Sequence, residues 1–69
     1  MKNDFIAAIG IAVKNLRLQK NVSQEELAHL SGISRSYISR LEAGKGNPSL
    51  NQVQRIAKAL GAKATIIIT

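Results

Sequence analysis

The apolar residues of this chain recur mostly every three or four positions, which is the spacing of one face of an α-helix. The pattern predicts a first helix over residues 4–19. Gly10 falls within it and lowers helix propensity by roughly 1 kcal/mol relative to alanine, so we expect another backbone to approach closely there. The apolar residues expected on its buried face are Phe5, Ile6, Ile9, Ala12, Val13 and Leu16.

Serines mark the starts of three further helices. In a capping box, a serine side chain bonds the backbone amide three residues on, and the side chain at that position bonds back. Ser23 with Glu26 and Ser49 with Gln52 have this spacing. Ser34 can cap a short helix between them.

Glycines mark where two of these helices end. The helix after Ser23 is predicted to stop at Ser31 and Gly32, where glycine can adopt a positive φ, and the helix after Ser49 is closed by Gly61. The apolar positions expected inside the three helices and the turns beside them are Leu27, Ala28, Leu30, Ile33, Ile38, Leu41, Leu50, Val53, Ile56, Ala57 and Leu60.

The end of the sequence breaks the helical pattern. Residues 64–69 are mostly β-branched and carry no helix signal, so they predict a short strand. Because a lone strand would leave an apolar edge unpaired, we expect it to pair with a second copy through Ile66, Ile67 and Ile68. The predicted fold is therefore all-α, a compact four- to five-helix bundle in one domain, 1–69, with a short C-terminal β-strand pairing across a dimer.

The charge and composition of the chain narrow the range of possible functions. Ten lysines and arginines against four acidic residues give a net charge of +6, which favours a polyanionic partner without choosing between nucleic acid, a membrane and an acidic protein. The chain has no cysteine, which excludes disulfides and cysteine-ligated metals and suits a reducing compartment. With one histidine, His29, and few acids, no nucleophile–base pair or metal-ligand cluster can be named. We therefore expect no enzyme activity, no cofactor and no metal.

An apolar run at residues 5–13 could mimic the core of a secretion signal. Asp4 stands where such a signal is basic, and no small-residue cleavage site follows. The run is also far short of the ~20 apolar residues that span a bilayer. We expect a cytoplasmic protein without a membrane partner.

Residues 23–42 have the layout of two helices of which the second reads DNA. A helix can enter the major groove if its outward side chains are polar and a preceding helix fixes its angle. The candidates for base readout are Arg35, Ser36, Tyr37 and Arg40, because arginine can donate two hydrogen bonds to guanine. Two alternatives stay open: the arginines form a solvated face, and Tyr37 packs inside.

The spacing of these residues resembles the Cro/cI-type (XRE-like) helix-turn-helix family over roughly residues 8–62. That resemblance implies a lambda-repressor-like fold that binds operator DNA, usually as a dimer. The segments that carry it are residues 10–17, 23–28, 32–34, 38–42 and 56–60, together with Gly44, Pro48 and Ser49.

The resemblance also implies roles for single residues. Gln24 would contact a phosphate or an end base pair, and Arg17 with Glu42 would form a structural ion pair between the first helix and the end of the third. The tail resembles the terminal strand of helix-turn-helix antitoxins. The positions that match phosphate-binding residues of the family are Lys45, Asn47, Ser49 and Asn51.

The leading hypothesis is a sequence-specific transcription regulator, a repressor, that binds a pseudo-palindromic operator in double-stranded DNA as a homodimer. The alternative is the antitoxin of a toxin–antitoxin module, which binds a toxin protein and autoregulates its operon. A nonspecific nucleic-acid chaperone is disfavoured, because binding by charge alone does not need a capped, rigid reading helix.

Overall fold

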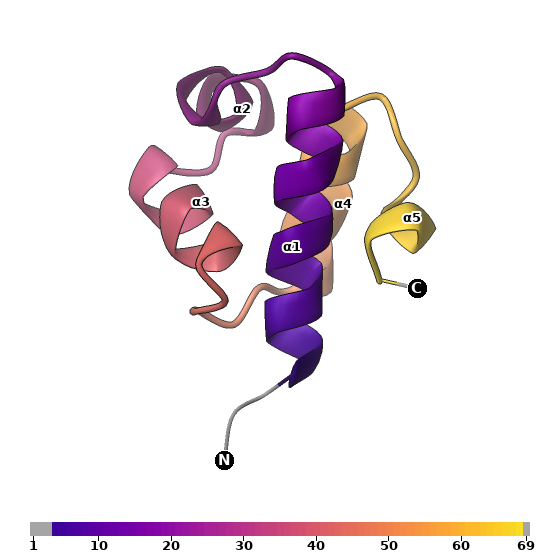
Figure 1. Ribbon diagram of the computed structural model, residues 1–69. Helices are drawn as coiled ribbons and strands as arrows, with labels where there is room; N and C mark the ends of the chain where they lie inside the picture. The colour runs from indigo at the N-terminus through magenta and orange to yellow at the C-terminus, as the bar shows by residue number, and fades with distance from the viewer. Residues whose placement is uncertain (1–3, 69) are drawn as a thin grey trace.

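The computed structural model describes residues 4–68, and this part of the chain forms five helices around one apolar core. In Figure 1, α2 and α3 lie on one side of the long helix α1, α5 lies on the other, and α4 lies behind. The five helices are α1 (Asp4–Gln19), α2 (Gln24–Ser31), α3 (Arg35–Glu42), α4 (Leu50–Ala59) and α5 (Ala64–Ile68).

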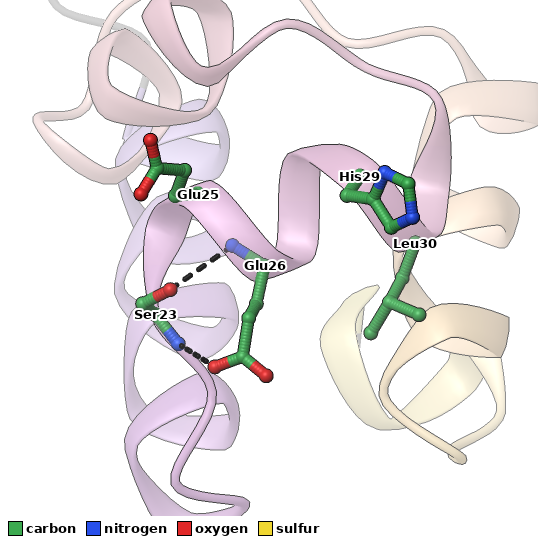
Figure 2. A pocket seen from close by; sticks show the side chains of 5 residues that line it. All are labelled: Ser23, Glu25, Glu26, His29 and Leu30. Carbon is green, nitrogen blue, oxygen red and sulfur yellow. Dashed lines mark hydrogen bonds between the residues drawn. The ribbon is translucent and has the colours of Figure 1, made fainter.

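The capping serines start their helices as the sequence predicts. Ser23 Oγ accepts a hydrogen bond from the Glu26 amide at 3.0 Å, and Glu26 Oε1 accepts one from the Ser23 amide at 3.2 Å (Figure 2). Ser49 and Gln52 make the same two bonds at 3.1 and 2.9 Å. Ser34 caps α3 through its side chain. These bonds satisfy amides that the first turn of a helix otherwise leaves unpaired.

Every helix contributes to the core, and most of the residues expected inside are there. Phe5, Leu30 and Leu50 are exceptions, because the structure exposes all three. Each lies in the first or last turn of its helix. The largest fully buried side chains are those of Val13, Leu27, Ile38, Leu41 and Ile56.

The predicted C-terminal strand is wrong. Residues 64–68 form the short helix α5, which packs against α1 and α4, and no strand occurs anywhere in residues 4–68. Ile67 is 4% exposed and joins the core, whereas Ile66 is 62% exposed. Strand preference spans only ~1 kcal/mol per residue, and burying an isoleucine gains about 1.5–3 kcal/mol, so burial decides the conformation. Ile68 lies in the same helix, and position 69 of the predicted strand lies outside the described residues.

The apolar run at residues 5–13 belongs to α1, whose 16 residues include the core positions Ile9 and Val13. Within residues 4–68, no helix combines the length and the apolar character that crossing a membrane requires.

Gly10 lets α1 and α3 approach each other at backbone distance, as its place in the helix predicts. It is buried, and a Cβ atom placed on it would collide with the carbonyl oxygen of Leu41. That neighbour is backbone, so it cannot rotate away as a side chain would. The distance between α1 and α3 is therefore set by the absence of a side chain at this position.

We predict that Gly10→Ala destabilises the protein by about 2 kcal/mol, because overpacking outweighs the helix propensity that alanine adds. Urea unfolding followed by circular dichroism measures the change. The matched control is Ala8→Gly at an exposed position of the same helix, with an expected loss of about 1 kcal/mol from propensity alone. A Gly10→Ala protein more stable than the wild type would show that α1 and α3 leave space for a methyl group at this position.

Candidate nucleic-acid interface

The outer face of α3 carries polar side chains without partners in the protein. Arg35, Ser36 and Arg40 are all exposed. None of the three makes a side-chain hydrogen bond or ion pair with residues 4–68. Their donors are therefore free for a ligand, which is the condition that base readout requires.

Tyr37 lies differently from the other three candidates. Its side chain is half-buried and packs under Gly46, whose Cβ, if present, would lie 3.2 Å from ring atom Cε1. The hydroxyl group is buried and has no hydrogen-bond partner among the described residues. The structure thus places the Tyr37 ring in a packing position, and its contact with a base stays a prediction.

Four of the residues expected to bind backbone phosphates lie in the loop before α4 and in its first turn. Lys45, Asn47, Ser49 and Asn51 are all exposed. Ser49 Oγ accepts the capping bond from Gln52, which leaves the hydroxyl hydrogen as a donor. The set offers an ammonium group, amide groups and a hydroxyl group at the start of a helix, a combination that suits phosphate oxygens.

Glu42, at the end of α3, is the centre of a polar cluster. Its carboxylate accepts hydrogen bonds from Arg17 Nε at 2.7 Å and Arg17 Nη2 at 3.0 Å. The two side chains are only 10% and 4% exposed, for Arg17 and Glu42 respectively. Arg17 Nη1 also donates to the carbonyl of Val22 at 2.8 Å. One bidentate ion pair therefore connects α1, the turn before α2 and the end of α3.

Gln24 belongs to the same cluster. Its Nε2 donates to Glu42 Oε1 at 3.0 Å, so the ion pair orients this half-buried side chain. Beside it is a shallow hollow of about 440 Å³, which Arg35 also lines. The structure thus places the predicted phosphate contact Gln24 and the predicted base reader Arg35 at the edge of one polar depression.

The cluster shifts the pKa values of both charged partners. The hydrogen bond to Glu42 raises the pKa of Arg17, against the effect of burial. Burial would raise the pKa of Glu42, but the hydrogen bonds from Arg17 and Gln24, with the positive charges of Arg17 and Lys14, hold it below its usual value. Both groups are therefore charged at neutral pH.

One further residue was not singled out in the sequence. Arg55 of α4 donates from Nε to the carbonyl of Ser31 and from Nη2 to the carbonyl of Gly32, both at 3.1 Å. In the sequence it is one more polar residue on an amphipathic helix. Its partners lie 24 and 23 positions away, so no local pattern could have revealed them.

The site offers hydrogen-bond donors and positive charge. Within residues 4–68, histidine and acidic side chains form no group of three that could hold a metal ion. The exposed side chains named above on α3 and before α4 all carry hydrogen-bond donors, and none of them is acidic. They suit a ligand that presents acceptors and negative charge over an extended surface, as a nucleic acid does.

The sequence profile of the helix-turn-helix family matches residues 13–67. The protein therefore belongs to the helix-turn-helix family of DNA-binding transcription regulators, and it is not an enzyme.

Several named proteins are similar to this chain. The protein is 42% identical over 64 residues to the control protein C.BamHI of Bacillus amyloliquefaciens, which covers 91% of this chain and 79% of that one. It is 33% identical over 60 residues to the immunity repressor protein of Bacillus phage phi105, which covers 87% of this chain and 42% of the repressor. The crystal structure of the restriction-modification controller protein C.AhdI from Aeromonas hydrophila matches with a TM-score of 0.90 at 35% identity, covering 94% and 98% of the two chains.

The pKa of Glu42 leads to a prediction about acid stability. Because its pKa is lower in the folded protein, the unfolded chain binds a proton more readily. The stabilisation that the charged Glu42 carboxylate provides is complete above the pKa of glutamate in the unfolded chain, about 4.3. It is lost as the pH falls through the lower pKa of Glu42 in the folded protein. We expect Glu42→Gln to be less stable at pH 7, by about 3 kcal/mol because Arg17 loses its counter-charge, and the difference to shrink below pH 4.

Urea unfolding between pH 3 and pH 7 measures this difference. Glu25→Gln is the matched control, because Glu25 is exposed and makes no hydrogen bond or ion pair with the described residues. A gap between wild type and Glu42→Gln that stays constant across the range would contradict the prediction.

Proposed function

We propose that the protein is a sequence-specific regulator that binds a pseudo-palindromic operator as a homodimer, with α3 in the major groove. The observation that carries this proposal is the set of unengaged donors of Arg35, Ser36 and Arg40 on a helix that a buried ion pair holds in place. Rigid presentation of free donors is what reading base edges needs and what binding by charge alone does not.

Contacts to the phosphate backbone would fix the position of α3 on the duplex. Gln24 lies at the start of α2 and donates to Glu42 at the end of α3, and the exposed residues before and within α4 follow that same end along the chain. The net charge of +6 supports association with a polyanion. The residues to which we assign this role are Gln24, Lys45, Asn47, Ser49 and Asn51.

We propose repression as the mode of regulation and the cytoplasm as the location. Relatives named as a control protein and an immunity repressor support a role in controlling transcription. The antitoxin hypothesis loses its main observation, because the terminal segment is a helix rather than a strand. No feature of the described residues favours a toxin partner over DNA.

The second copy would bind through the outer face of α5 instead of a strand. Ile67 faces the core and is closed to a partner, whereas Ile66, its neighbour, is exposed. An exposed isoleucine on a packed helix gains free energy when a second copy covers it. A two-fold axis there would relate two copies of α3, and reading successive major grooves requires the two copies to lie about 34 Å apart.

Selection of bound sequences from a random DNA pool tests the proposal. We expect the wild type to select a pseudo-palindromic site. Arg40→Ala should lose the preference for one base at one position in each half of that site. Lys45→Ala should weaken binding to all sequences alike and reduce the dependence on salt, because it removes one phosphate contact. Equal affinity of the wild type for all sequences would contradict sequence-specific binding.

We predict that Ile66→Asp converts the dimer to a monomer and weakens operator binding at least tenfold, because a charge cannot be buried at the interface without a partner. Sedimentation gives the mass, and circular dichroism checks the fold. The matched control is Leu30→Asp on α2, outside the proposed interface, because Leu30 is 57% exposed and Ile66 is 62% exposed. An unchanged mass for Ile66→Asp would remove α5 from the interface.

A further inference from the structure

Four polar backbone groups of the turn between α2 and α3 are paired. The Gly32 amide donates to the carbonyl of Ala28 at 2.9 Å, which closes α2. The Ile33 amide donates to the buried Ser31 side chain at 3.2 Å. The carbonyls of Ser31 and Gly32 accept from Arg55. The turn is therefore held both from within and from α4.

The guanidinium group of Arg55 can fix the orientation of the α2–α3 turn as well as its distance from α4. Its donors lie in one rigid plane, and two of them, Nε and Nη2, engage two successive carbonyls of the turn. Such charge-assisted bonds are stronger than neutral ones. A pair of them resists rotation of the backbone between Ser31 and Gly32, which a single bond would permit.

Gly32 provides the space for this contact. Its φ is +71°, and a Cβ placed on it would lie 2.6 Å from Arg55 Nη2. Glycine at this position therefore serves two purposes, because it adopts the left-handed backbone that ends α2 and admits the guanidinium group.

We propose that Arg55 is a positioning residue for DNA readout: by clamping the α2–α3 turn, it sets the angle at which α3 meets the base edges. The inference rests on the proposed function. Arg35 follows Gly32 by three residues, so a rotation in the turn displaces the whole reading face. Hydrogen bonds to bases tolerate little displacement, whereas attraction to phosphates depends mainly on charge.

The experiment compares Arg55→Gln, Arg55→Lys and the control Lys58→Gln. Lys58 is exposed on the same helix, and its side chain bonds none of the described residues. The affinities for the selected operator and for random DNA are measured over a range of salt, at a temperature where circular dichroism shows every variant folded. The readout is the ratio of the two affinities, because a loss of folded protein lowers both and leaves the ratio unchanged.

We expect Arg55→Gln and Arg55→Lys to reduce the ratio about tenfold, since glutamine and lysine each end in a single donor nitrogen and cannot bond the two carbonyls from two nitrogen atoms fixed in one plane. Lys58→Gln should leave the ratio at the wild-type value while weakening random-DNA binding as much as Arg55→Gln does. In the free protein, amide NMR shifts of α3 should move further in Arg55→Lys than in Lys58→Gln.

Three results would overturn the inference. A wild-type ratio in both Arg55 variants would show that the clamp does not affect readout. Full recovery in Arg55→Lys would assign the effect to charge alone. A salt dependence weakened in Arg55→Gln but not in Lys58→Gln would make Arg55 a phosphate contact. If the wild-type protein itself binds the operator and random DNA equally, the proposed function fails. That result is distinct from the three above, in which the wild type keeps its preference for the operator.

Discussion

The buried carboxylate of Glu42 is the constraint on which the arrangement of the helices depends. A carboxylate removed from water costs several kcal/mol unless it is paired and hydrogen-bonded. Arg17 and Gln24 supply those bonds from α1 and α2. Apolar packing is non-directional and would allow these helices to slide, whereas the carboxylate is satisfied in only one arrangement. The ion pair therefore contributes more to the orientation of α3 than to the gross stability of the bundle.

Helix α3 is held at three points by three kinds of interaction. Its end is held by the ion pair of Glu42, its approach to α1 by the contact of Gly10 with the Leu41 carbonyl, and the turn before it by Arg55. A helix of eight residues has little stability of its own in water. Its rigidity comes from these neighbours, and the apolar side chains of Ile38 and Leu41 complete the attachment.

The sequence predicted the features that depend on neighbouring residues. The capping boxes of Ser23 and Ser49 are such features, because donor and acceptor lie three residues apart. The strand was wrong because the conformation of Ile67 depends on a core built from distant segments. Arg55 was missed for the same reason, since an arginine bonded to backbone carbonyls has no signature of its own in the sequence. The family resemblance suggested the ion pair, but the bond from Gln24 to it appears only in the structure.

The side chains that hold α3 in place and those that we propose read base edges are different sets, whereas Gln24 and Ser49 combine a structural bond with a proposed phosphate contact. The exposed side chains of Arg35, Ser36 and Arg40 bond none of the described residues, so replacing them costs the fold little, typically within about 0.5 kcal/mol. A duplicated gene could therefore change its target site by a few substitutions without first acquiring compensating mutations elsewhere. The separation of support from recognition makes this small domain a scaffold on which new specificities can evolve independently of stability.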